Sequence, residues 1–102
     1  MDTGKSGQMN IRRLLLDVDK ALKRPSLLEI GQAIEGVAGV EGLNITVTSI
    51  DTETVGMDVT IVGNNLNYEA IEAAIEKPGA VVHSIDELVA GTRLIDRIKR
   101  SR

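Results

Sequence analysis

Three side chains in this sequence could together form a small metal or acid–base site: Asp17, Asp58 and His83, the only histidine in the chain. Carboxylate oxygens are the ligands that calcium, magnesium and manganese prefer, and an imidazole nitrogen would also admit zinc. Further acidic residues are expected near the same rim: Asp19, Asp51 and Glu53. Because like charges on neighbouring strands repel, a divalent cation would stabilise such a cluster. The alternative is a set of solvated carboxylates beside an ordinary surface histidine, which is the commoner situation for charged residues.

The elements that would position these side chains follow from the hydrophobic pattern. Alternation of apolar and polar residues predicts four strands, over residues 11–18, 43–50, 57–63 and 80–87. Apolar residues at helical spacing predict two helices between them. The first begins near Pro25 and is stopped by Gly36 and Gly39, and the second follows an Asn67 cap and is ended by Pro78 and Gly79.

The order βαββαβ is that of the ferredoxin-like sandwich, an α+β fold in which a four-stranded antiparallel sheet carries both helices on one face. The strands should lie in the spatial order four, one, three, two. The core is expected where the sheet meets the helices: Leu14, Leu16, Val18, Ile45, Val47, Val59 and Ile61 beneath Ile30, Ile34, Ile71 and Ile75. The domain's own helices leave the other side of the sheet, here called the open face, uncovered.

The two ends of the chain differ from this domain, which is expected over residues 10–91. Residues 1–9 are polar and without periodicity, and they are expected to form a disordered leader. Residues 92–102 form a basic tail, in which a short helix is predicted from Thr92. Residues 1–92 carry 14 acids and 7 bases, whereas the last ten residues carry five bases and one acid. Such a tail could neutralise phosphates, or its cations could suit the negative pole of a helix end.

A repeated segment bears on the orientation of His83. The sequence VTSID at 47–51 corresponds to VHSID at 82–86, so that Thr48 in the first half of the fold matches His83 in the second. This correspondence predicts that His83 lies on the open face. Because strand one lies between strands three and four, it also predicts that Asp17, Asp58 and His83 come together there.

Five branched aliphatic residues are expected on the open face: Leu15, Ile50, Val62, Val81 and Ile85. An apolar patch that the domain's own helices do not cover usually contacts a partner. We therefore expect a homo-oligomer that associates through the open face or the edge strands of the sheet.

The composition excludes several other functions. The chain has no cysteine, which excludes disulfides and paired-cysteine metal loops and suits a cytoplasmic protein. Aromatic residues make up 1% of the chain, so the sheet lacks the stacking residues of an RNA-binding domain, and nucleic acid is not expected as a partner. No apolar run reaches membrane-spanning length. Gly4-Lys5-Ser6 is a fragment of a phosphate loop without the strand and the earlier glycine that such a loop needs.

No set of catalytic residues can be assembled, and the sequence favours a binding protein over an enzyme. Ser84 follows His83 directly and would point to the opposite face of the sheet, which excludes a serine–histidine–acid triad. At the other rim, the start of strand one is expected to form cross-strand ion pairs with the end of strand four, between Arg12 and Arg13 on one side and Asp86 and Glu87 on the other.

Three segments resemble an archaeal family of unknown function, domain of unknown function 211: IRRLLLDV from residue 11, GLNITVTSIDTET from residue 42 and VVHSIDELVAG from residue 81. The resemblance covers roughly residues 10–91 and includes neither end of the chain. It implies a small ferredoxin-like domain that assembles into higher oligomers. It implies no activity and no catalytic residue.

Overall fold

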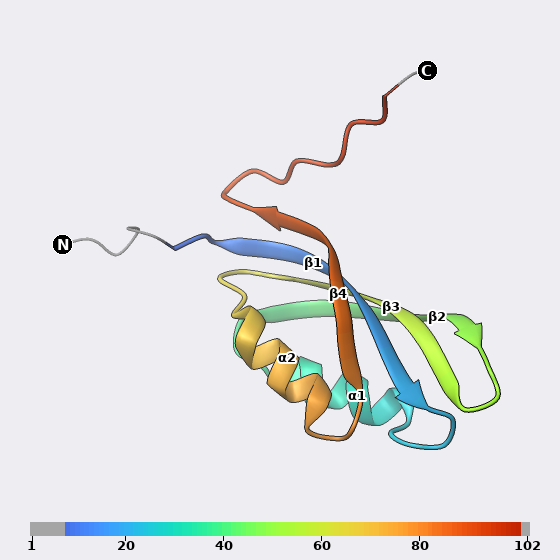
Figure 1. Ribbon diagram of the computed structural model, residues 1–102. Coiled ribbons are helices and arrows are strands. Elements are labelled where there is room, and N and C mark those ends of the chain that lie inside the picture. Colours follow the sequence, from blue (N-terminus) through green and yellow to red (C-terminus); the bar gives the residue numbers. More distant parts are fainter. Residues whose placement is uncertain (1–7, 101–102) are drawn as a thin grey trace.

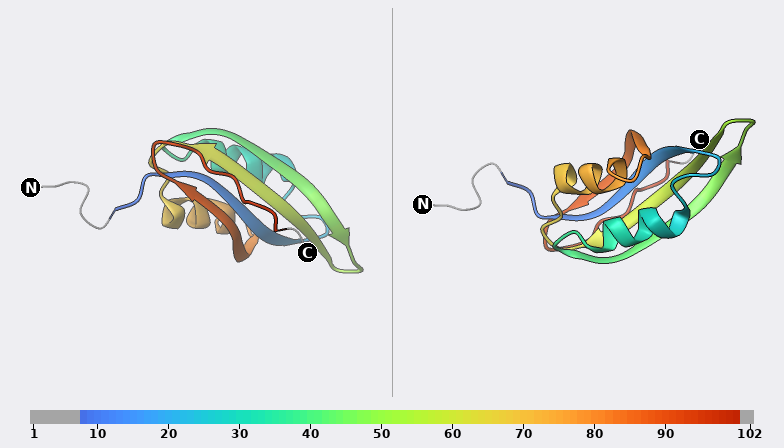
Figure 2. Two further views of the ribbon diagram at one scale, coloured as in Figure 1. Left: turned by 90° about the horizontal axis from the view of Figure 1, so that it is seen from above. Right: turned by 90° about the horizontal axis from the view of Figure 1, so that it is seen from below.

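The computed structural model describes residues 8–100 and shows the order βαββαβ (Figure 1). The elements are β1 (Ile11–Ala21), α1 (Leu27–Glu35), β2 (Val40–Ile50), β3 (Thr54–Gly63), α2 (Tyr68–Glu76) and β4 (Val81–Ala90). The strands form one antiparallel sheet in the order β2-β3-β1-β4. Both helices lie on the same face of the sheet (Figure 2). The predicted ferredoxin-like sandwich and its strand order are confirmed.

Local sequence signals explain where the helices begin. The Ser26 side chain accepts a hydrogen bond from the backbone of Glu29, and the Glu29 carboxylate accepts one from the backbone of Ser26, which forms a capping box. Asn67 caps α2 in the simpler way, by accepting from the backbone of Ala70. The Asn67 cap of α2 is therefore the predicted one, whereas α1 begins after Ser26, so that Pro25 precedes the helix instead of lying in its first turn.

The core lies between the sheet and the two helices, as predicted. The fully buried side chains are Leu14, Leu16, Val18, Ile30, Ile34, Met57, Val59, Ile61, Ile71 and Ile75. Ile45 and Val47 were predicted in this layer as well, but Ile45 is only partly buried and Val47 is exposed. Both belong to β2, which is an edge strand, so neighbouring residues cover them from one side only.

Both edge strands contain a β-bulge at the same place in the repeated segment. In β2, Val47 pairs with Met57 and Ser49 with Gly56, which leaves Thr48 as the extra residue. In β4, Val82 pairs with Val18 and Ser84 with Asp17, which leaves His83 as the extra residue. The two matching sequences therefore form the same local structure, in which one strand gains a residue relative to its neighbour.

The bulges reverse part of the predicted alternation. Each extra residue shifts the register by one position, so the isoleucine that follows moves to the other face. Ile50 pairs with Val55 and Ile85 with Leu16, and both partners belong to the core layer. The predicted open-face positions of Ile50 and Ile85 are therefore wrong, because both lie on the helix side of the sheet edges.

The short helix predicted from Thr92 is not present. Residues 92–100, here called the C-terminal arm, contain no regular secondary structure and continue on the side of the sheet opposite the helices (Figures 1 and 2). The predicted apolar stripe of this helix, Leu94, Ile95 and Ile98, is exposed. A helix this short is marginal by itself and needs an apolar surface to pack against, which the arm lacks within the described chain. Of the predicted leader, only Gln8 and Met9 lie within the described residues.

None of the helices in the described part of the chain is both long enough and apolar enough to cross a membrane.

Candidate functional site

The centre of the open face carries two carboxylates directly opposite each other. Asp17 of β1 pairs with Asp58 of β3 in the sheet register. Ser84 of β4 lies opposite Asp17 on its other side, and Thr46 of β2 lies opposite Asp58. Paired residues of antiparallel strands place their side chains on the same face, about 5 Å apart at Cβ. The structure thus brings together two of the three residues expected to form a site.

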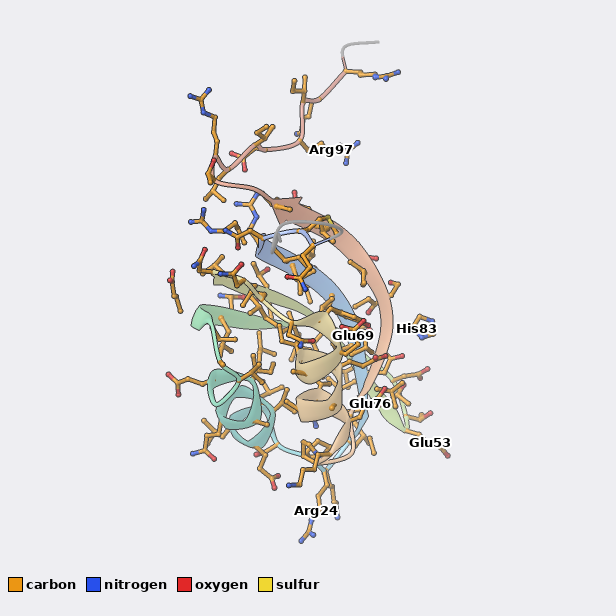
Figure 3. The ribbon with its side chains drawn as sticks, turned by 90° about the vertical axis from the view of Figure 1, so that its left-hand side faces the viewer. Arg24, Glu53, Glu69, Glu76, His83 and Arg97 are labelled. Carbon is orange, nitrogen blue, oxygen red and sulfur yellow. The ribbon has the colours of Figure 1, made fainter. Side chains whose placement is uncertain are left out.

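The third residue, His83, contacts a different carboxylate. Its Nδ1 lies 3.7 Å from Oδ2 of Asp19, and both side chains are largely accessible to solvent. Ser84 was expected on the helix side of the sheet, but it lies opposite Asp17 on the open face, because His83 is the bulged residue. Figure 3 shows the imidazole projecting outward from β4. Among residues 8–100, no three His, Cys, Asp or Glu side chains are grouped so that they could hold a metal ion.

Polar side chains surround Gly56, which lies beside Asp19 on the open face. Gly56 pairs with Asp19 on one side and with Ser49 on the other. A Cβ at Gly56 would lie 2.6 Å from Ser49 Oγ, 3.5 Å from Asp19 Oδ1 and 3.7 Å from Thr48 Oγ1. A glycine inside a strand often marks such a close approach. Thr48 and Ser49 of β2, Asp19 of β1 and His83 of β4 form one line of polar side chains across the open face, interrupted by Gly56 of β3, and this line is here called the polar row.

Asp19 was expected only as a neighbour at the rim, and neither Ser49 nor Gly56 was expected in a site. A signal for this row was present in the repeated segment. Each repeat places a hydroxyl or imidazole at the bulge, in Thr48 and His83, and a serine directly after it. A bulge re-aims such side chains, and bulges are common beside functional sites.

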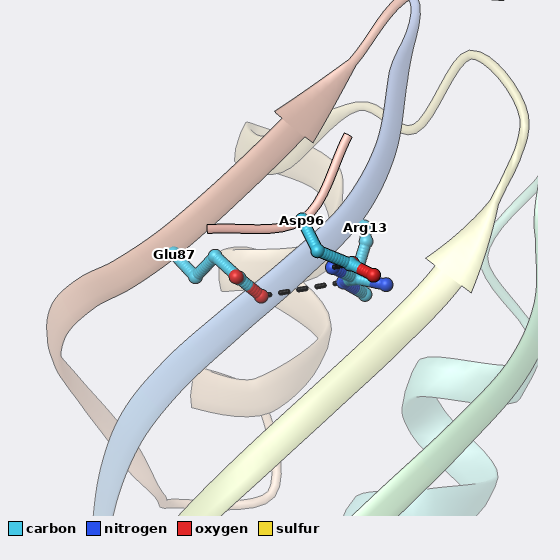
Figure 4. A network of polar contacts seen from close by, with 3 residues as sticks. All are labelled: Arg13, Glu87 and Asp96. Atoms are coloured by element: carbon cyan, nitrogen blue, oxygen red, sulfur yellow. Dashed lines mark hydrogen bonds and ion pairs between the residues drawn. The ribbon is translucent and has the colours of Figure 1, made fainter. Parts of the chain in front are cut away.

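The ion pairs at the opposite rim differ in part from those predicted. Arg13 pairs with Glu87 at 3.2 Å, as expected, and also with Asp96 of the C-terminal arm at 2.6 Å (Figure 4). The hydrogen bond with Asp96, together with the charge of Glu87, raises the pKa of Arg13, and burial opposes this only in part. Asp86 instead accepts a hydrogen bond from the Ser84 hydroxyl, at 2.7 Å.

The predicted partner of Asp86, Arg12, binds backbone oxygens rather than carboxylates. Its guanidinium donates to the carbonyl oxygens of Gly63, Gly91 and Thr92, at 2.9, 3.2 and 3.4 Å. These bonds connect the end of β3 to the start of the C-terminal arm. Arg12 and Arg13 together therefore fix where the arm leaves the domain.

Two grooves run along the edges of the sheet on its helix side. The β4–α2 groove has a volume of about 510 Å³ and a mixed lining, apolar at Met9, Ile11, Leu14, Leu66, Ile85 and Leu88 and polar at Gln8, Asn65, Asn67, Tyr68 and Glu69. Burial, followed by the nearby Glu72, Glu76 and Glu69, raises the pKa of Tyr68. The β2–α1 groove has a volume of about 380 Å³ and is lined by Leu27, Leu28, Gly31, Gln32, Glu35, Leu43 and Ile45.

The five residues predicted as an open-face patch are thus divided between two surfaces. Leu15, Val62 and Val81 lie on the open face, paired with Thr60, Arg13 and Asp19 respectively. Ile50 lies on the helix side at the end of β2, and Ile85 lines the β4–α2 groove. Exposed aliphatic side chains therefore gather at the edges of the sheet as well as on its open face.

Comparison with known proteins supports the resemblance found in the sequence. The chain is 40% identical over 89 residues to an uncharacterised protein, MJ0319, of Methanocaldococcus jannaschii. The alignment covers 87% of this chain and 91% of that protein. The model of the family DUF211, described as uncharacterised ArCR, matches residues 12–102. The match includes the basic C-terminal arm, which the resemblance in the sequence had left out. The chain therefore belongs to the DUF211 family.

Proposed function

We propose that this protein is an oligomeric binding or regulatory module whose copies associate through the edges of the sheet. The observation that supports this most directly is the exposure of large aliphatic side chains beside both edge strands: Leu28, Val47 and Ile50 at β2, and Ile85 and Leu88 at β4. Apolar patches of this kind usually mark contacts with partners. The two edges differ in sequence, so contact between them is heterologous, and a repeated contact can close into a ring.

This mode of association leaves the polar row accessible. The row lies on the open face, whereas both grooves lie on the helix side. Copies joined by their edges would therefore present one row each to solvent, where a polar ligand can reach Asp19, His83 and Ser49. We place the module in the cytoplasm, which suits the cysteine-free sequence.

Self-association is tested by sedimentation of the purified protein at micromolar concentration. We expect a mass that is a multiple of 11.0 kDa. Ile85→Lys should reduce this mass, because it places a charge in the β4–α2 groove, where the contact is expected to be desolvated. Val62→Lys is the matched control, since it adds the same charge on the open face at similar exposure. If the wild-type protein sediments as a monomer, the proposal is wrong. If Val62→Lys dissociates the oligomer and Ile85→Lys does not, the copies associate through the open face.

A divalent-cation site is the second candidate function, and the facing pair Asp17 and Asp58 favours it. Without a cation, like charges directly opposite each other are destabilising. Asp58→Asn should therefore raise the free energy of unfolding in metal-free buffer, by roughly 0.2–1 kcal/mol.

The same variant tests cation binding. Added calcium or manganese should raise the melting temperature of the wild-type protein in proportion to the logarithm of metal concentration once the site is nearly filled. Asp58→Asn should show no such rise, whereas Asp51→Asn, in the turn between β2 and β3, should keep it. If calcium, magnesium, manganese and zinc all leave the wild-type melting temperature unchanged, the cation site is excluded.

A further inference from the structure

Two arginines of β1 hold the C-terminal arm at its start. Arg12 donates to the carbonyl oxygens of Gly91 and Thr92, where the arm begins. Arg13, whose side chain lies on the open face, binds the carboxylate of Asp96 at 2.6 Å (Figure 4). From this anchor the arm continues over the sheet in the general direction of β1, while it rises away from the strands (Figures 1 and 2). The arm therefore follows β1 with one contact to its open face already made.

Beyond the anchor, alternate residues of the arm are an aliphatic and a cation. In an extended chain every second side chain lies on the same side, so Ile98 and Arg100 share the side from which Asp96 contacts β1. Ile98 is 83% exposed, which is the highest value for any large hydrophobic side chain among residues 8–100. One side of an extended arm thus presents, in order, an anion, an aliphatic side chain and a cation over about 13 Å.

The open face of β1 presents the complementary order at the same spacing. Leu15 and Asp17 follow Arg13 on this face, two and four residues along the strand, which again spans about 13 Å. An extended arm that runs along β1 from the anchor therefore brings Ile98 over Leu15. Its next cation on that side, Arg100, then lies over Asp17. The two segments match in register, with one apolar pair between two pairs of opposite charge.

The facing carboxylates at the centre of the open face favour this contact further. Asp17 lies directly opposite Asp58, an arrangement of like charges that is destabilising without a counter-charge. Neither carboxylate forms an ion pair within residues 8–100. A guanidinium has five N–H groups, so one arginine can donate to two carboxylates at once. Arg100 is therefore suited to neutralise the pair.

We propose that the C-terminal arm closes as a strap along β1, over the open face of its own domain. Ile98 then packs on Leu15. Arg100 lies between the facing carboxylates, Asp17 and Asp58. The arm closes within one chain because its anchor lies in that chain and its extended length suffices. The closed arm competes with a divalent cation for the facing carboxylates, and this consequence alone rests on the second candidate function.

Because the chain has no cysteine, introduced thiols can test the register of the strap. Thr60 pairs with Leu15 on the open face, so Thr60→Cys with Ile98→Cys should be joined by a short thiol reagent that spans about 10 Å, the distance between packed layers. Cysteine is itself a small apolar side chain, which keeps part of the contact. The intact mass should be that of one 11.0 kDa chain with one bound reagent.

The matched control places the second thiol elsewhere on the same face. Val81 lies opposite Asp19, four residues further along β1 than Leu15, and it is 53% exposed. Val81→Cys with Ile98→Cys should therefore link several-fold more slowly. Equal rates for the two pairs would overturn the register. Products that contain two chains in place of one would overturn closure within a chain.

A change of charge tests the role of Arg100. Added to the linking pair at positions 60 and 98, Arg100→Glu should slow the reaction by about two- to fivefold, because it places a further carboxylate against Asp17 and Asp58. Lys99→Glu makes the same change of charge at the next residue, which alternation turns away from the sheet, and it should slow the reaction less. Equal slowing by both variants would contradict the contact of Arg100 with the facing carboxylates.

Competition with a cation is measured separately, from the melting temperature in calcium or manganese. Arg100→Gln should lower the metal concentration that gives the half-maximal rise by about two- to fivefold, because the competing charge is gone, whereas Lys99→Gln should leave it unchanged. An unchanged response in Arg100→Gln would overturn the competition. If positions 60 and 98 link in register but no metal alters the melting temperature, the cation site is excluded and the strap is supported. A metal response without linking in register would overturn the strap and support the cation site.

Discussion

Replacing Ile61 with alanine will lower the free energy of unfolding by about 2–5 kcal/mol. Ile61 is fully buried on β3, a central strand, where it pairs with Leu14 on one side and with Leu43 on the other. Removal of its side chain leaves a cavity that the surrounding strands can only partly fill. Chemical denaturation of the variant and the wild-type protein, followed by circular dichroism, measures this difference. Protein concentration should be equal in both, because association also contributes to stability.

The neighbouring residue provides the control. Val62 follows Ile61 on the same strand but lies on the open face, opposite Arg13. It keeps 38% of its surface exposed, so Val62→Ala should cost less than about 1 kcal/mol. An unfolding midpoint that Ile61→Ala leaves unmoved would show that the layer between sheet and helices is assigned wrongly.

Replacing Gly63 with alanine will destabilise the protein by about 3 kcal/mol, because the added methyl group has no room. A Cβ at Gly63 would collide with the backbone oxygen of Gly39 and would lie 2.8 Å from a methyl carbon of Leu66. The Gly39 oxygen also accepts a hydrogen bond from the backbone of Asn64, so the collision cannot be relieved by a side-chain rotation. Thermal unfolding followed by circular dichroism would record the loss as a lower melting temperature.

Gly31→Ala is the matched substitution at a glycine that has room. Gly31 lies inside α1, and an added Cβ would lie 3.8 Å from Leu43 and Ile45, which is ordinary contact. Alanine is the better helix residue, so this variant should gain roughly 0.5–1 kcal/mol. Equal effects at Gly31 and Gly63 would contradict the close approach between Gly39 and Gly63.

The order of elements and the core could be predicted from the sequence because each depends on local periodicity. Alternation identified all four strands, and helical spacing placed Ile30, Ile34, Ile71 and Ile75 over the sheet. Local periodicity was not sufficient for the helix expected from Thr92, which is not present. Its apolar spacing was suitable for a helix, but a helix also needs a surface to cover, and spacing alone does not supply one.

The candidate site could be predicted only as far as the strands are regular. The pairing of Asp17 with Asp58 follows from the strand order and from alternation in β1 and β3. The partner of His83 could not be found in this way, because the bulge adds one residue to β4 and moves Ser84 opposite Asp17. The repeated segment revealed that Thr48 and His83 are equivalent. It did not reveal that both are bulged, since alternation assumes an uninterrupted register.

The paired bulges also bear on how this protein avoids aggregation. An exposed edge strand offers a row of unpaired N–H and C=O groups, to which another chain can add without limit and so form fibrils. Here the edge strands β2 and β4 each contain the same interruption, at Thr48 and at His83. A bulge twists the edge and breaks the even spacing that a further strand would have to match. The geometry of both edges therefore favours finite assemblies joined by side chains over open-ended growth of the sheet.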